Sequence, residues 1–226
     1  MINTFWLAVR AVPVTLQITV VSLALALPLG FGMALARIYR VRIAGEFSAL
    51  YISFIRGTPM VLQILIVYSL LPSLLNAVVK SRGWAINVFD LNPIVYAYAV
   101  FSLNNAAALA ELFRSALSTV DKGQHEAALA TGLSPVQSFA RIVIPQALVS
   151  ALPNMCNLTI TLIKNTSLAF IMTVKDITAA AKIEASYGYN YVEAYVDIFI
   201  LYIIICALVQ AAFHQAEARF GVYKKS

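Results

Sequence analysis

The longest uncharged stretch of the chain is the feature that most restricts its fold. Residues 11–36 hold 26 consecutive positions without Asp, Glu, Lys or Arg. About 20 apolar residues are enough for a helix to cross a bilayer, so this run can span with some tilt. Only 12% of the chain is charged and 61% is hydrophobic, whereas soluble domains have about 25% charged residues. The sequence therefore predicts an integral membrane protein.

Five long apolar runs predict an all-α helical bundle of five transmembrane helices, forming a single domain over residues 1–226. Runs of this length favour helices over a β-barrel, whose strands are about 10 residues long and alternating. The expected spans are 11–36, 59–79, 93–110, a fourth that starts near 142, and 194–213. Residues 43–55 are expected to lie at the membrane interface. Residues 80–91 and 175–191 are expected to form outer loops.

Proline, glycine and capping residues mark where these spans begin and bend. Pro28, with Gly30 and Gly32 close behind, predicts a kink near the end of the first span. Thr58 is expected to cap the second span and Pro59 to open it.

Basic residues predict the orientation. Arg37, Arg40 and Arg42 directly follow the first span, which places that loop in the cytoplasm and the N-terminus outside. Nine basic residues then fall in inside segments and five in outside segments, as expected for a cytoplasmic C-terminus. The inside set is Arg37, Arg40, Arg42, Arg114, Lys122, Arg141, Arg219, Lys224 and Lys225, and the outside set is Arg10, Lys80, Arg82, Lys175 and Lys182.

The stretch from Glu126 to Pro145 carries most of the polar chemistry between the third and fourth spans. Glu126, Ala127 and Ala128 favour a helix, which Gly132 can end by adopting a positive φ angle. Ser134 followed by proline then predicts the start of a second helix. The stretch is therefore interpreted as a helix–turn–helix lying flat at a membrane face.

This stretch resembles the permease subunits of ABC importers, whose pattern is E-A-A, three residues, G, nine residues, I-x-L-P. The match has Ile144 where leucine is usual, and its surroundings resemble the polar amino acid permeases (histidine, glutamine, arginine and cystine). Three further segments also resemble that family: Arg56, Gly57, Thr58 and Pro59, then residues 110–114, and then residues 164–168. Ser115 stands where a glycine is usual. This variant and the long 80–91 loop favour a cystine-type carrier.

The resemblance implies a role and a set of partners. Glu126, Ala127, Ala128, Gly132 and Pro145 would form a coupling helix that docks on a cytoplasmic ATPase. The chain would work in the bacterial plasma membrane with a second permease subunit, identical or homologous. Two ATP-binding subunits and an extracytoplasmic solute-binding protein would complete the importer. ATP and magnesium would bind the ATPase, leaving no cofactor in this chain.

Polar side chains inside the spans predict a substrate path. Ser150, Asn154, Asn157, Thr161 and Lys164 are spaced four, three, four and three, which places them on one helical face. Lipid does not accept such a stripe, so it faces other helices, a partner or an aqueous path. Asn104 and Glu111 share a face of the third span, and Glu111 is close enough in sequence to pair with Arg114.

Two alternative roles remain open for the polar residues of this face. The amides and hydroxyls can instead join helices together, and Lys164 can be neutralised by Glu111 rather than meet a substrate carboxylate.

Other classes of function have less support in the sequence. The chain has no G-x-x-x-x-G-K-[ST], H-E-x-x-H or G-x-S-x-G motif, so we expect no enzyme activity. Its histidines and cysteines lack metal-ligand spacing, and its basic residues form no nucleic-acid patch. The alternatives are a permease for another small polar solute, and with less support an ion channel or an intramembrane enzyme.

Overall fold

The computed structural model describes residues 2–220, with side chains from residue 4 onward. The described chain is almost wholly helical. In chain order its elements are α1 (Ile2–Arg10), α2 (Val12–Ile38), α3 (Arg42–Gly57), α4 (Met60–Ser81), η1 (Val88–Asp90), α5 (Pro93–Ser118), α6 (Lys122–Ala130), α7 (Pro135–Ser138), η2 (Phe139–Val143), α8 (Ile144–Asn165), η3 (Thr166–Met172), α9 (Ile177–Gly188) and α10 (Tyr191–Phe220). Lys224 and Lys225 of the predicted inside tail lie outside the described residues.

Five helical stretches between residues 2 and 220 are long and apolar enough to cross a membrane. They are Thr4–Ile38, Met60–Ser81, Pro93–Ser118, Pro135–Met172 and Tyr191–Phe220. The prediction of an all-α protein with five spans is therefore confirmed, but several predicted bounds are too short. The third helix continues to Ser118 because Glu111 and Arg114 pair with each other and do not end it.

The core of the bundle is the contact between α2 and α5. Small residues recur every fourth position on α2, where Ala26, Gly30 and Ala34 are all buried. This spacing lets two helix backbones approach closely. At Gly30 the approach is so close that a Cβ atom would lie 2.7 Å from the Cβ of Leu109. Gly30 therefore serves helix packing, and α2 continues as helix through Pro28 to Ile38.

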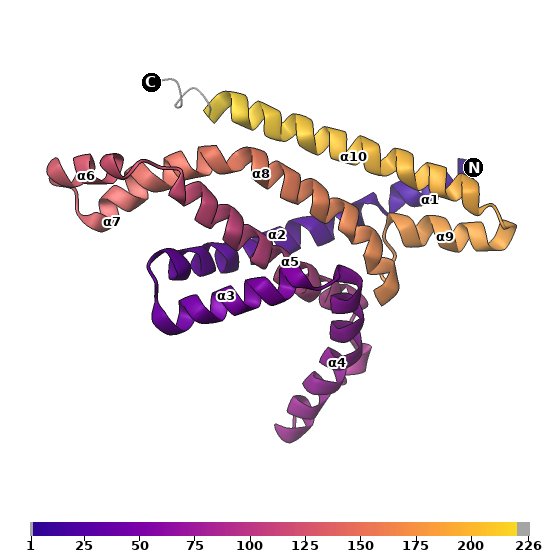
Figure 1. The fold of residues 1–226 in the computed structure, drawn as a ribbon. Coiled ribbons are helices and arrows are strands. Elements are labelled where there is room, and N and C mark those ends of the chain that lie inside the picture. Colours follow the sequence, from indigo (N-terminus) through magenta and orange to yellow (C-terminus); the bar gives the residue numbers. More distant parts are fainter. Residues whose placement is uncertain (1, 221–226) are drawn as a thin grey trace.

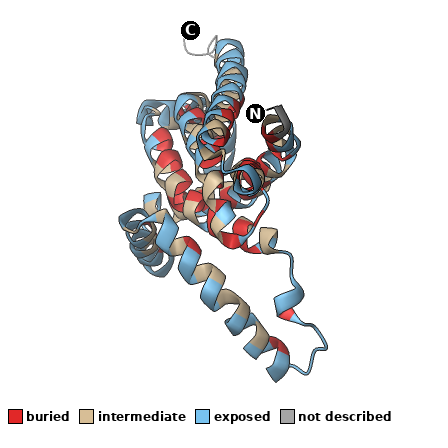
Figure 2. Ribbon diagram, turned by 90° about the vertical axis from the view of Figure 1, so that its right-hand side faces the viewer, coloured by how far each residue is buried: buried red, intermediate tan, exposed pale blue. Residues whose placement is uncertain are grey.

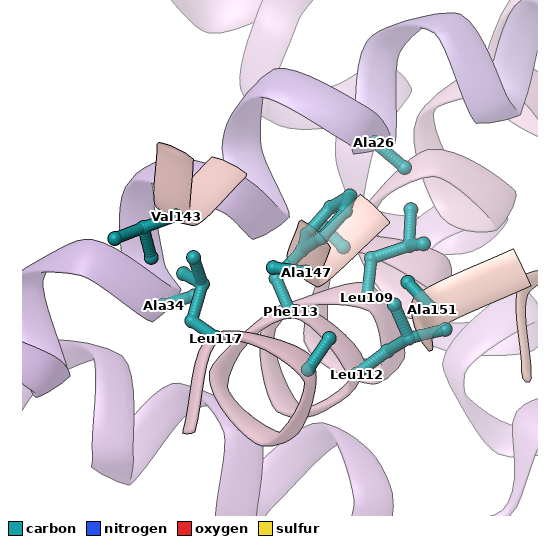
Figure 3. Packing of buried hydrophobic residues seen from close by; sticks show 11 residues of the cluster. Ala26, Ala34, Leu109, Leu112, Phe113, Leu117, Val143, Ala147 and Ala151 are labelled. Carbon is teal, nitrogen blue, oxygen red and sulfur yellow. The ribbon is translucent and has the colours of Figure 1, made fainter. Parts of the chain in front are cut away.

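Side chains of η2 and α8 complete this core. Figure 3 shows Val143, Ala147 and Ala151 directed toward Leu109, Leu112, Phe113 and Leu117 of α5. Phe113 also meets Phe31 of α2 edge to face, with ring centroids 5.4 Å apart. Because lipid is as apolar as these side chains, close packing rather than water exclusion holds the three helices together.

The corner between α3 and α4 differs from the prediction. Thr58 does not cap α4, since its hydroxyl donates to the Phe54 carbonyl of α3 at 2.9 Å. Pro59 has the extended conformation that precedes the first turn of α4. This arrangement follows from proline, which disfavours helical geometry in the residue before it.

Residues 175–191 were expected to form a polar outer loop, and this prediction is wrong. They contain α9, which begins at a cap made by Asp176, whose carboxylate accepts from the Ala179 N–H at 2.9 Å. Ile177, Ala181 and Ala185 are fully buried against α1 and α10. The helix forms because small alanines fit a face that packs closely against two neighbours.

Figure 1 shows how the elements are arranged. The α6–α7 pair lies at one end of α8, on the same side as the α2–α3 corner, while α1 and α9 lie toward the other end. α4 extends away from the other helices and has only 11% of its membrane window buried. Figure 2 shows buried positions along inward helix faces and exposed positions outside. The outer surface is thus left for lipid or for partner subunits.

Candidate functional site

The predicted helix–turn–helix between the third and fourth spans is present as α6, a glycine turn and α7. Asp121 begins α6 by accepting a hydrogen bond from the Gly123 N–H. The helix ends when the Leu133 N–H donates to the Ala128 carbonyl at 3.2 Å and the Gly132 N–H donates to that of Leu129 at 3.0 Å. This pair of hydrogen bonds is the Schellman motif, which needs a residue in the left-handed conformation just after the helix. Gly132 supplies it with φ +89°, as predicted.

The second helix begins as the sequence indicates. The Ser134 hydroxyl accepts from the Gln137 N–H at 3.3 Å, and the Gln137 side chain accepts from the Ser134 N–H at 3.0 Å. This capping box satisfies two backbone donors, and Pro135 occupies the first turn, where a missing N–H costs nothing. We refer to residues 122–138 as the hairpin.

The outward surface of the hairpin mixes apolar and polar side chains and holds one base and one acid, Lys122 and Glu126. Glu126 and Ala127 are exposed, whereas Ala128 faces inward and is buried. Val136 on α7 is 77% exposed.

Pro145 does not lie on the hairpin, although it belongs to the predicted coupling set. It stands in the first turn of α8, after the π-turn η2, in which the Ile144 N–H donates to the Phe139 carbonyl. Proline has no N–H for the Arg141 carbonyl four residues back, and its ring crowds that carbonyl in a regular helix. The wider π-turn relieves this conflict and separates α7 from α8.

One contact inside the hairpin has no signal in the sequence. His125 of α6 and Ser138 of α7 meet across the turn, with Nδ1 2.8 Å from Oγ. Ser138 is fully buried. A cavity of about 360 Å³ lies beside this pair and is lined in part by Tyr39 and Phe139.

Glu111 does not pair with Lys164, so that predicted alternative is wrong for this structure. Its carboxylate accepts from Arg37 of α2 and from Arg114 of α5, the latter at 2.9 Å. The predicted pairing with Arg114 is confirmed. Two arginines against one carboxylate leave a local excess of positive charge, and the pair to Arg37 ties α2 to α5.

Asn104 takes part in a second polar network. Its amide donates to the Gln63 side chain at 2.8 Å. Gln63 in turn donates to the Ile55 carbonyl and to the Thr58 hydroxyl, both at 2.8 Å. The network satisfies carbonyls at the end of α3 and fixes the α3–α4 corner to α5. Arg56, Gly57 and Pro59 are exposed at this corner.

Most of the polar stripe of α8 is exposed, and part of it borders α10. Asn154, Asn157, Thr161 and Lys164 are exposed. Thr161 donates to the Asn157 carbonyl at 2.8 Å, which satisfies its hydroxyl within the helix. Asn157 also lines a groove of about 470 Å³ with residues of α10, including Gln210 and Glu217. Among the described residues, no hydrogen bond or ion pair joins this stripe to Asn104 or Glu111.

The residue that caps α9 is a buried acid, which the sequence analysis did not single out. Asp176 is fully buried, and the Tyr202 hydroxyl donates to its second oxygen at 3.4 Å. Burial raises the pKa of Asp176 to about 6, and the hydrogen bonds from the α9 backbone only partly oppose this. The residue lies outside the five membrane-spanning stretches.

These features define a helical membrane protein of five spans with an exposed hairpin between the third and fourth. Residues 26–221 match the family described as "Binding-protein-dependent transport system inner membrane component". The chain belongs to this family, so it is a transport permease and not an enzyme. The expectation of a multi-pass protein of the plasma membrane is thereby confirmed.

Several relatives extend over most of the chain. It is 41% identical over 207 residues to the L-cystine transport system permease protein TcyL of Bacillus subtilis, covering 92% of this chain and 84% of that one. It is 36% identical to the probable amino-acid permease protein YxeN of the same species, covering 97% and 95%. Octopine permease OccM of Rhizobium radiobacter is 38% identical, covering 95% and 86%.

Solved structures show the same fold. The crystal structure of an amino acid ABC transporter with histidines matches with a TM-score of 0.81 and 25% identity, covering 97% of this chain and 96% of that one. The MetNI methionine ABC transporter in an inward-facing conformation matches with a TM-score of 0.71 at 22% identity, covering 95% and 96%.

Proposed function

We propose that this chain is the permease subunit of an ATP-driven importer of polar amino acids, with cystine as the first substrate to test. The observation that carries the proposal is the 41% identity over 92% of the chain to a cystine permease. The octopine relative makes amino-acid conjugates the second class of substrate to test.

The proposed importer has two permease subunits, because five spans do not enclose a gated path by themselves. The exposed stripe of α8 supports this arrangement, since its amides, hydroxyls and ammonium group need polar partners within a membrane. The stripe faces the second permease and the substrate path between them. An external solute-binding protein delivers the substrate.

Energy enters through the hairpin, which docks on a cytoplasmic ATPase. Its exposed Glu126 and Ala127 on α6, with Val136 on α7, support a docking role. ATP and magnesium bind the ATPase subunits, and this chain holds no cofactor. ATP binding draws two hairpins together and rocks the spans between outward-open and inward-open states. The hairpin and the C-terminus are cytoplasmic, and the N-terminus is outside.

Asn157, Thr161 and Lys164 are the proposed substrate contacts of this subunit. A zwitterion that leaves water needs hydrogen-bond partners and a counter-charge, and this face offers an amide, a hydroxyl and an ammonium group. Asn104 and Glu111 were predicted for the same path. Because they bond to Gln63, Arg37 and Arg114, their proposed role is to hold the helices beside the path.

Uptake by cells that express the complete importer tests the proposal. Labelled cystine, arginine, glutamine and octopine are supplied one at a time, with each unlabelled compound as competitor. We expect saturable uptake of at least one of them, lost when this subunit is deleted. Uptake that is unchanged by the deletion for all four compounds would contradict the proposal.

A further inference from the structure

His125 and Ser138 make the only described side-chain hydrogen bonds that join α6 to the rest of the hairpin across its turn. The ring Nδ1 lies 2.8 Å from the Ser138 Oγ, and the Ser138 hydroxyl also lies 3.5 Å from the His125 carbonyl. Ser138 is fully buried. A buried hydroxyl that loses its partner is costly, so this contact strongly favours one angle between α6 and α7.

Backbone hydrogen bonds from the Gly132 N–H to Leu129 and from the Leu133 N–H to Ala128 close the turn, but neither of them reaches α7. Gly132 has φ +89°, and a Cβ atom built on it would meet nothing within 4 Å. Glycine has more conformational freedom than any other residue. α7 is only four residues long, so it has few contacts of its own with which to hold α6.

Beyond Ser138 the chain is connected to two spans. Phe139 begins the π-turn that continues into α8. Its ring also meets Tyr39, next to the end of α2, edge to face at a centroid distance of 6.0 Å. A displacement that reaches Ser138 is therefore passed to both α8 and α2.

We propose that His125 and Ser138 are a positioning pair that makes the hairpin rigid. Movement of α6 by a docked ATPase then shifts α8 and the end of α2, instead of being absorbed by bending at Gly132. This inference rests on the proposed docking of the hairpin. The pair makes no contact with substrate and acts through the elements that it joins.

The test uses the complete importer in proteoliposomes and compares four variants. Ser138→Ala removes the hydroxyl, and Ser138→Thr keeps it. Ser118→Ala is the matched control, because that hydroxyl donates within α5 to the Arg114 carbonyl at 2.8 Å. Glu126→Lys reverses a charge on the exposed docking face. The measurements are co-purification of the ATPase and the number of substrate molecules moved per ATP hydrolysed.

We expect Ser138→Ala to keep its ATPase but to move about threefold to tenfold less substrate per ATP, as loss of one ordinary hydrogen bond predicts. Ser138→Thr and Ser118→Ala should match the wild type. A wild-type ratio in Ser138→Ala would overturn the positioning role. Loss of the ATPase equal to that in Glu126→Lys would also overturn it, because the pair would then serve docking.

A distance measurement tests rigidity without relying on docking. Spin labels are placed at Gln124 and Val136, both exposed, after Cys156 and Cys206 are replaced by alanine. We expect a narrow distance distribution in the wild type and a broad one in Ser138→Ala, and equal widths would overturn the proposal. If Glu126→Lys docks and couples normally, the docking assignment fails, and a broad distribution would still show that the pair holds the hairpin.

Discussion

Asp176 combines two effects that oppose each other. It caps α9 through the Ala179 N–H, yet its side chain is fully buried. Because burial raises its pKa from 3.8 to about 6, the folded protein binds this proton more tightly than the unfolded chain. The resulting stability is present in full below about pH 4 and is lost as the pH rises through 6. The penalty above that pH is about 3 kcal/mol, from about 1.4 kcal/mol per pKa unit.

Asp176→Asn should remove this pH dependence, since Asn caps a helix about as well as Asp and carries no charge. We expect the variant to unfold at least about 5 °C above the wild type at pH 8 and close to it at pH 4. Thermal unfolding of the purified subunit in detergent checks this. Asp121→Asn is the control, because it changes a cap that is exposed. A variant no more stable than wild type at pH 8 would contradict the burial argument.

Thr161 and Thr159 provide a matched pair on α8. Each hydroxyl donates to the carbonyl four residues back at 2.8 Å, but Thr161 is exposed and Thr159 is buried. If the exposed face borders the substrate path, Thr161→Val should raise the KM for uptake about threefold to tenfold, as loss of one hydrogen bond predicts. Thr159→Val should leave KM unchanged. Equal KM values in both variants and the wild type would remove Thr161 from the path.

At the scale of single elements, α2 and α5 depend on their close contact at Gly30. A Cβ at this position would lie 2.7 Å from the Leu109 Cβ, whereas one at Gly32 would meet nothing within 4 Å. Gly30→Ala should therefore destabilise the bundle by about 1–3 kcal/mol through overpacking, and Gly32→Ala should not. The measurement is the unfolding midpoint of each variant in detergent. If Gly30→Ala and Gly32→Ala unfold at the same midpoint as the wild type, the close contact at Gly30 does not stabilise the bundle.

The elements that the sequence predicted well are those with a local signal. The spans follow from apolar length, and the hairpin follows from Gly132, Ser134 and Pro135, whose conformations are fixed by their own chemistry. α9 was missed because its scattered charges, such as Lys182 and Glu184, outweighed its alanines, although Asp176 offered a capping signal. An Asp three residues before a run of alanines is a start signal for a helix.

Contacts between distant elements could not be predicted in the same way. Arg37 and Glu111 are separated by 74 positions in the chain, and a sequence does not state how far one span slides along another. The same applies to Gln63 with Asn104 and to His125 with Ser138. A Lys164–Glu111 pair was one of two alternatives that the sequence left open, and in the structure Glu111 pairs with Arg37 and Arg114 instead.

At the scale of the whole molecule, sidedness is the simplest property to test. Ile43 lies in the first turn of α3 and is 83% exposed, and Ile86 lies in the loop after α4 and is 55% exposed. In a background without Cys156 and Cys206, Ile43→Cys should resist a membrane-impermeant thiol reagent in intact cells and react after permeabilisation. Ile86→Cys should react in both. Since both positions are exposed, the reversed labelling pattern would show that the chain has the opposite orientation in the membrane.

The central claim is that this permease moves amino acids with energy received through its hairpin. The most direct measurement is cystine uptake by proteoliposomes that contain the complete importer. ATP is enclosed on the side of the ATPase, and the solute-binding protein and cystine are supplied on the opposite side. Gly132→Pro should abolish ATP-driven uptake, because proline cannot adopt the φ of +89° found there. Glu126→Lys should lower it together with ATPase co-purification, while both variants still insert in the membrane. ATP-driven uptake at the wild-type rate in both variants would contradict the account.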